Sequence, residues 1–120
     1  MFRRIQNERD VTDFLEKVNG LHDGYLIGVS YVHSGHGTGN PHWIAPEKRE
    51  LLLRYQVTSV WDRIVELRFM GLRDWQIRDD GEEILDCRVT FVGGEILWAE
   101  DPEDGSHVRA RKMAWRIVAE

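Results

Sequence analysis

The chain has 120 residues, of which 42% are hydrophobic and 31% are charged, as in ordinary globular domains. Its formal net charge is −5, because 21 Asp and Glu residues outnumber 16 Lys and Arg residues, and this balance disfavours binding to nucleic-acid phosphates. The sequence contains no apolar run of about 18 residues, the length that spans a bilayer. We therefore expect a single domain over residues 1–120, with neither nucleic acid nor membrane among its partners.

The N-terminal residues and the cysteine content indicate the compartment. Charged and amide side chains follow Ile5 at once, so the apolar core of a signal peptide is missing. Cys87 is the single cysteine, which excludes an internal disulfide and is typical of a reducing environment. We expect a cytoplasmic protein.

The first element in chain order is a helix over residues 11–19. Its apolar residues recur at helical spacing, after Asp10 as the N-cap and before Gly20 as the C-terminal stop. They are Val11, Phe14, Leu15 and Val18. This stripe must cover something, and the rest of the sequence offers only a sheet.

Alternation of apolar and polar residues predicts six strands after the helix. They cover residues 25–32, 51–57, 65–69, 85–91, 95–99 and 107–118. Residues 71–77 either continue the third strand or form a short one of their own. In the last strand the apolar parity changes midway, which predicts a bulge near Arg111 and Lys112.

The predicted fold class is α+β, with one N-terminal helix packed on a curved, mostly antiparallel sheet of about six strands joined as a meander. Packing of the helix on the sheet is expected to bury Phe14, Leu15, Val18, Tyr25, Ile27, Leu53 and Leu67. Most of the five tryptophans should lie in the core, and an exposed one would be a binding anchor.

His22 and Asp23 stand between the helix and the first strand and are the first candidates for chemistry. Metal-dependent phosphohydrolases contain a His-Asp step, but they spread their ligands over several helices, and this sequence predicts one. A hydrogen bond from either side chain to nearby backbone is the simpler interpretation. We keep His22, Asp23 and the adjacent Tyr25 as binding candidates.

Residues 34–49 form the longest irregular stretch, rich in glycine and histidine. His36 and His42 could join His22, His33 and Asp23 at a metal, since imidazole binds zinc, copper and nickel, but no regular element fixes their spacing. The glycines lack the Lys-Ser/Thr ending of a phosphate-binding loop. We predict no metal and no cofactor, and keep His36, His42 and Trp43 as candidates for an alternative small-ligand or metal site.

The sequence predicts no catalytic set. Cys87 shares the parity of core residues, no serine lies in a nucleophile elbow, and paired carboxylates occur in turns. Residues 79–104 contain ten acids and one base, Arg88. This segment is either a solvated rim or a surface that attracts a basic protein. Its binding candidates are Trp98, Glu100, Asp101, Glu103 and Asp104.

Several segments resemble a group of uncharacterised small bacterial proteins with a His-Asp step after a short helix and a C-terminal Trp-Arg strand. They are residues 21–26 (Leu-His-Asp-Gly-Tyr-Leu), 29–32, 64–72, 95–101 and 110–116. The layout is similar, more distantly, to immunity proteins of bacterial toxin systems. That resemblance implies a small, acidic, cytoplasmic protein without catalysis, and it supplies no catalytic residue. Residues 34–43 depart from the pattern.

Taken together, the residues and the resemblance predict a non-enzymatic protein-binding module, immunity-protein-like, with an acidic surface for a basic partner. One alternative is a small-ligand or metal-binding domain with a site near His22, Asp23, His36 and His42. The other is a structural homo-oligomer that pairs through an edge strand, with Trp61 or Trp75 in the interface.

Overall fold

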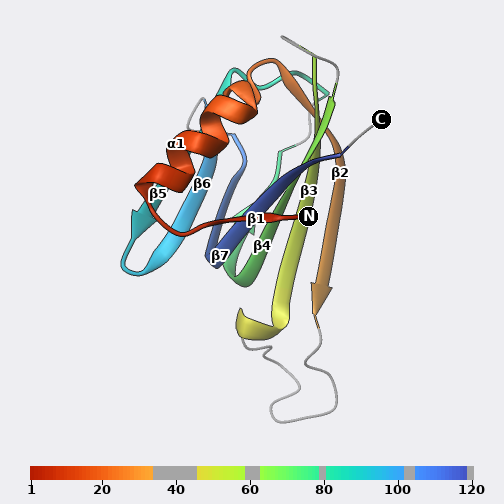
Figure 1. Cartoon of the computed structure of the whole chain (residues 1–120). Helices are drawn as coiled ribbons and strands as arrows, with labels where there is room; N and C mark the ends of the chain where they lie inside the picture. Colours follow the sequence, from red (N-terminus) through yellow and green to blue (C-terminus); the bar gives the residue numbers. More distant parts are fainter. Residues whose placement is uncertain (34–45, 59–62, 79–80, 102–104, 119–120) are drawn as a thin grey trace.

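The computed structural model describes residues 1–33, 46–58, 63–78, 81–101 and 105–118 (Figure 1). The candidates His36, His42, Trp43, Trp61, Glu103 and Asp104 lie outside these residues. In chain order the elements are β1 (Arg3–Ile5), α1 (Glu8–Lys17), a 3-10 turn (Asn19–Leu21), β2 (Gly24–His33), a 3-10 turn (Pro46–Lys48), β3 (Arg49–Val57), β4 (Arg63–Gln76), β5 (Asp86–Val92), β6 (Glu95–Asp101) and β7 (His107–Val118).

The seven strands form one antiparallel sheet in the order β2-β3-β4-β7-β6-β5, with β1 paired to β7. The α+β class with one helix and a mostly antiparallel sheet is therefore present in the described residues. The predicted meander is wrong, because β4 pairs with β7 rather than with β5, so that two three-stranded meanders meet along the two longest strands. The strand count also exceeds the expected six, since β1 has three residues and is too short for a periodic signal.

The sheet curls around an aromatic core. The Trp98 ring on β6 lies 6.0 Å from that of Tyr55 on β3 and 5.9 Å from that of Phe69 on β4, although two strands of the sheet lie between β6 and β3 and one lies between β6 and β4. On the opposite face the Glu66 carboxylate lies between Arg54, at 3.1 Å, and Arg116, at 2.6 Å. One face is therefore apolar and the other carries ion pairs.

The predicted change of parity in the last strand is confirmed by its burial, because Arg111 and Lys112 are both exposed between buried neighbours. The register irregularity falls instead on the partner strand β4, between Leu72 and Asp74. Nearby, Gly71 adopts φ +69°, and a Cβ there would lie 2.9 Å from the Arg111 Cβ. Glycine thus lets β4 change its buried face together with β7.

Helix α1 begins earlier than expected because Asn7, not Asp10, is its N-cap. The Asn7 side chain accepts a hydrogen bond of 2.9 Å from the Asp10 N–H, and the Asp10 carboxylate accepts one of 2.9 Å from the Gln6 N–H. The Phe14 ring packs on the Trp115 ring of β7, with the two ring centroids 5.4 Å apart. No helix in the described part of the chain is long and apolar enough to cross a bilayer.

The helix does not cover the first long strand. Leu53 and Leu67 are buried as expected, but Tyr25 and Ile27 are exposed, so their predicted burial under the helix is wrong. Two features explain this: β2 is the terminal strand of the sheet, and its register shifts between Leu26 and Gly28. In Figure 1, α1 lies on the left beside β5 and β6, whereas β2 forms the right margin.

Candidate functional site

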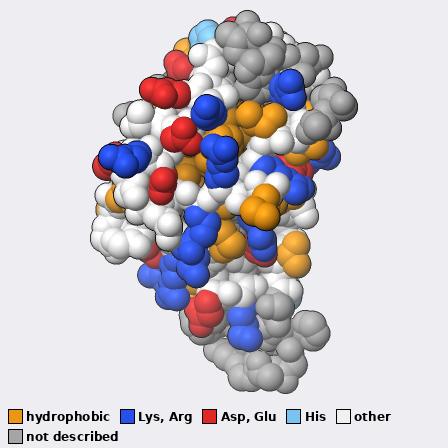
Figure 2. Space-filling model, in the orientation of Figure 1, with side chains coloured by type: hydrophobic (Ala, Val, Ile, Leu, Met, Phe, Trp, Pro, Cys, Tyr) orange, Lys and Arg blue, Asp and Glu red, His pale blue; other side chains and the backbone are white. Residues whose placement is uncertain are grey.

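Strand β2 is ten residues long and contains no Asp, Glu, Lys or Arg. Nine large hydrophobic side chains are exposed in the described residues, and five of them lie on this strand. They are Tyr25 (39%), Ile27 (48%), Val29 (47%), Tyr31 (39%) and Val32 (56%). The exposed apolar surface of the molecule is therefore concentrated on one strand. On the face that Figure 2 draws, hydrophobic side chains reach the surface among Lys and Arg.

The outer edge of β2 is almost entirely unpaired in the described structure. It meets another segment at Gly24, whose carbonyl accepts a hydrogen bond of 2.9 Å from the Ile84 N–H, while the Asp23 N–H donates to the Ile84 carbonyl at 2.9 Å. Beyond Gly24, no described strand adds to this edge. Edge strands are usually protected by lysine, proline or strong twist. In the part of β2 and its surroundings that the structure describes, the register shift between Leu26 and Gly28 is the one such device.

At its C-terminal end, β2 presents a rigidly held tyrosine. The Tyr31 ring stacks on Trp75, with centroids 5.7 Å apart and planes at 26°. The Arg49 guanidinium lies 5.8 Å from the same ring, and Arg49 Nε donates to the Tyr31 hydroxyl at 3.1 Å. Tyr, Trp and Arg dominate binding hot spots, because they offer large, rigid contact surfaces. This cluster has the composition of an anchor.

The same end of β2 is basic. Glu47 is paired with Arg111 at 3.5 Å and Glu50 with Arg68, so these two acids are already neutralised. The hydrogen bonds of Arg49 go to neutral acceptors, namely the Tyr31 hydroxyl and the Arg73 carbonyl. Lys48 precedes it in the 3-10 turn. Positive charge is therefore available beside His33.

At its N-terminal end, β2 begins in an acidic joint made by His22, Asp23, Glu83 and Asp86. The His22 Nδ1–H donates to the Leu85 carbonyl, and the ring lies 3.4 Å from Asp23 and 3.7 Å from Asp86. The Leu85 carbonyl, together with these carboxylates, raises the pKa of His22. His22 thus bonds to backbone as expected, but to a carbonyl 63 residues away rather than a local one.

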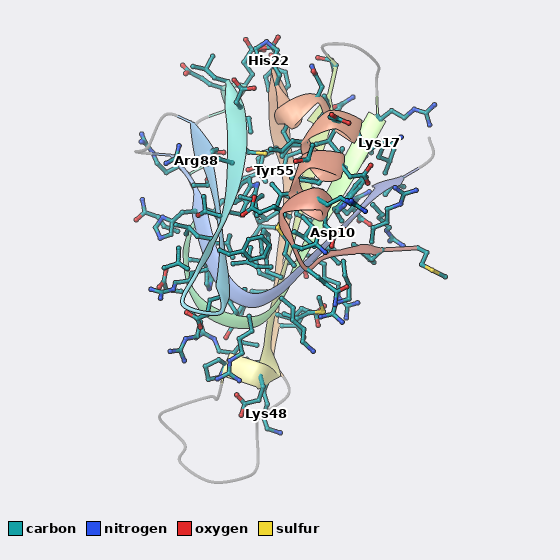
Figure 3. All side chains as sticks on the ribbon, turned by 60° about the vertical axis from the view of Figure 1, so that its left-hand side comes forward. Asp10, Lys17, His22, Lys48, Tyr55 and Arg88 are labelled. Carbon is teal, nitrogen blue, oxygen red and sulfur yellow. The ribbon has the colours of Figure 1, made fainter. Side chains whose placement is uncertain are left out.

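Several residues of this joint and of the turn before it adopt left-handed backbone conformations. Asn19, Leu21 and Asp23 adopt φ of 54°, 56° and 59°, and Gly20 between them adopts 62°. Left-handed φ values are costly for residues with a side chain. They place Tyr25 so that its hydroxyl donates to Glu83 at 3.3 Å, and the carboxylate raises the pKa of Tyr25. Figure 3 shows His22 at one end of the molecule and Lys48 at the opposite end.

The acidic segment does not form one surface. The Glu95 carboxylate pairs with Arg73 at 2.8 Å and with Arg109 at 2.9 Å. Glu100 is only 7% exposed; it accepts hydrogen bonds from the Tyr55 hydroxyl at 3.2 Å and the Ser106 N–H at 2.8 Å. Burial and this carboxylate raise the pKa of Tyr55. Glu100 is therefore buried in the core and does not lie on an exposed binding surface.

Trp98 is likewise buried in the core and is not an exposed anchor. A sequence signal for both corrections exists, because Ile96, Trp98 and Glu100 share one parity and hence one face of β6. Asp101 ends β6 opposite Asp86, and its side chain lies outside the description. The exposed acids that remain in the described part of the segment, Glu82, Glu83 and Asp86, are those next to the joint.

The described histidines do not build a metal site. Within the residues that the structure describes, no three His, Cys, Asp or Glu side chains are arranged to hold an ion. His33 ends β2, and His22 begins the strand at the other end of the same element. The strand itself therefore keeps these two candidates apart.

Comparison with protein-family models, with curated proteins and with solved structures finds no significant match to this chain. The resemblance to small bacterial proteins and to immunity proteins stays a prediction. The residues that sequence reasoning missed are Val29, Val32, Arg49 and Tyr31. Trp75, expected at the interface of a homo-oligomer, stacks on Tyr31. One signal could have indicated the first two: a ten-residue strand without a single acid, lysine or arginine.

Proposed function

We propose that this chain is a non-enzymatic protein-binding module that accepts an extended segment of a partner along the free edge of β2. The observation that carries the proposal is an uncharged edge strand with five exposed hydrophobic side chains. A bound segment gains affinity from main-chain hydrogen bonds and specificity from alternate side chains. The unpaired N–H and C=O groups of β2 supply the former, and Val29 and Tyr31 the latter.

The charges at the two ends of β2 give the partner an orientation. The acidic joint favours basic residues in the part of the bound segment that lies beside Gly24. Lys48 and Arg49 favour acidic residues in the part that lies beside His33. An antiparallel partner would then carry acidic residues before its strand and basic residues after it. The basic partner expected from the sequence is retained in this form, but its contact surface moves from residues 79–104 as a whole to the joint.

The arrangement of the buried polar groups supports a binding role rather than an enzymatic one. Glu100, Tyr55 and Ser106 hydrogen-bond to one another inside the core and are closed off from solvent. A reacting group must instead be reachable by a substrate. These residues serve to fix β3 to β6.

The test is selection from a displayed library of random ten-residue peptides on the full chain. We expect enriched peptides that alternate aliphatic residues and end in Lys or Arg. Val29→Lys should weaken their binding at least tenfold, because a lysine would be placed in the apolar contact. Val92→Lys is the matched control: Val92 is also 47% exposed but lies on β5, and it should leave binding unchanged.

Two outcomes would overturn the proposal. One is that selection on the native chain enriches no peptide more strongly than selection on the Val29→Lys variant does. The other is that both lysine variants weaken binding equally, which would place the contact elsewhere or indicate adhesion without a defined site.

A further inference from the structure

We propose that the occupant of the free edge is β2 of a second copy of this chain, paired antiparallel about a two-fold axis so that two sheets become one. This inference rests on the proposed function, since it names the partner of the same edge. It is carried by three observations: the absence of charge on the strand, the opposite charges at its two ends, and the contrast with the other edge of the sheet.

The first argument is the match between β2 and itself. A charged residue placed against the Val29 region would lose water without gaining a counter-ion. The occupant should therefore be uncharged over about the length of β2, and β2 itself meets this condition over all ten residues. Around a two-fold axis the same surface serves both sides of the contact, so one favourable strand is sufficient.

The second argument is the direction of pairing. Antiparallel strands bring the Gly24 end of one copy to the His33 end of the other. The acidic joint, with Glu83 and Asp86, then faces Lys48 and Arg49 of the second copy, and the symmetry makes this contact twice. Parallel strands would bring like charges together and are disfavoured. Figure 3 shows His22, in the acidic joint, and Lys48 at opposite ends of the molecule. The acidic end of one copy can therefore meet the basic end of the other.

The third argument is the contrast between the two edges of the sheet. Strand β5 carries Asp86 and Arg88, and the 3-10 turn after α1 lies against it, since a Cβ at Gly20 would lie 3.1 Å from Asp86 Oδ1. Charge and a covering turn or helix are two ways in which proteins protect an edge. β2 has neither among the described residues, although it is the longer strand.

Sedimentation equilibrium of the full chain at low salt tests the inference. We expect a mass of twice 14.1 kDa that falls towards one copy on dilution. Val29→Lys should raise the dimer dissociation constant at least tenfold, and Val92→Lys should leave it unchanged. Circular dichroism confirms that both variants remain folded, as expected for exposed positions.

Charge reversal tests the direction of pairing. Glu83→Lys and Lys48→Glu should each weaken the dimer severalfold at about 0.1 M salt, where screening is incomplete, and the double variant should recover most of the loss. Arg9→Glu, on the helix surface, is a control that should leave the dimer as it is.

The outcomes separate the two proposals. A chain that is monomeric at every concentration, yet binds selected peptides through Val29, overturns self-pairing and leaves the proposed function standing. A dimer that survives Val29→Lys overturns the inference, and one that is lost in Val92→Lys places the contact on β5. If the double charge variant is weaker than both single ones, the antiparallel direction is wrong.

Discussion

Strands β2 and β3 lie side by side and have almost the same pattern of apolar residues. In β3 the alternating residues Leu51, Leu53, Tyr55 and Val57 are all fully buried. In β2 the alternating residues Tyr25, Ile27, Val29 and Tyr31 are between 39% and 48% exposed. Nothing in the period distinguishes them. Two features of the structure make the difference. Among the described strands, β3 has a neighbour on each edge and β2 has one on a single edge, and the register shift between Leu26 and Gly28 places Tyr25 opposite Gln56 but Val29 opposite Leu53, so that the apolar residues of β2 do not share one face.

The comparison shows what periodicity can and cannot predict. Alternation indicates that a segment is extended and has one apolar face, but it does not say how many layers or neighbours cover that face. An apolar face on a terminal strand is therefore either a cost to stability or a contact surface. The lack of any acid, lysine or arginine in β2 favours the second interpretation.

The largest expected effect comes from shortening one aliphatic side chain on each strand. Leu53→Ala should lower the free energy of unfolding by about 2–5 kcal/mol, because it leaves a cavity in the core. Val29→Ala should lower it by less than about 0.5 kcal/mol, as for other surface positions. Urea denaturation of dilute protein measures both. Equal losses would mean that β2 is covered in solution even at low concentration.

The second effect compares two tyrosines that donate to glutamates. Tyr55→Phe should cost about 1–3 kcal/mol, because it removes a donor from the buried Glu100 carboxylate. Tyr25→Phe should cost about 0.5 kcal/mol or less, since Glu83 is exposed and water replaces the lost donor. Thermal unfolding at fixed pH measures the two. A large cost at Tyr25 would contradict the exposed geometry of the joint.

The smallest effect is a pH dependence at the joint. The Leu85 carbonyl and the carboxylates of Asp23, Asp86 and Glu83 raise the pKa of His22 above 6.5, so the folded state binds a proton more tightly than the unfolded state. The added stability is fully present below pH 6.5 and is lost as the pH rises through the folded-state value. The stability difference between the native chain and His22→Gln should shrink over that range. An unchanged difference from pH 5 to pH 9 would contradict it.

Much of the fold could be predicted from the sequence, because its elements follow local rules. All six expected strands exist, and residues 71–76 continue the third of them as part of β4. The pairing of β4 with β7 could not be predicted, since alternation carries no information about which edges meet. The helix starts three residues before the expected Val11, because Asn7 and Asp10 are both capable caps and the sequence does not rank them.

The candidate site was predicted less well than the fold. His22, Asp23 and Tyr25 do lie together at one end of β2, because the chain makes them neighbours. The anchor at the other end joins Tyr31, Arg49 and Trp75 from three strands. Such a cluster depends on the curl of the sheet, which brings the end of β4 back over β2. No spacing rule in one sequence contains that information.

The place of β7 has a consequence for how the chain is made. β7 pairs with β1, β4 and β6, and Arg3 lies opposite Trp115. A ribosome must therefore finish residues 107–118 before the first strand and the middle of the sheet find their neighbour. Contacts between residues so far apart in sequence slow folding. Until then, the edge of β4 that pairs with β7 stays open, and an open strand edge in an incomplete sheet favours aggregation.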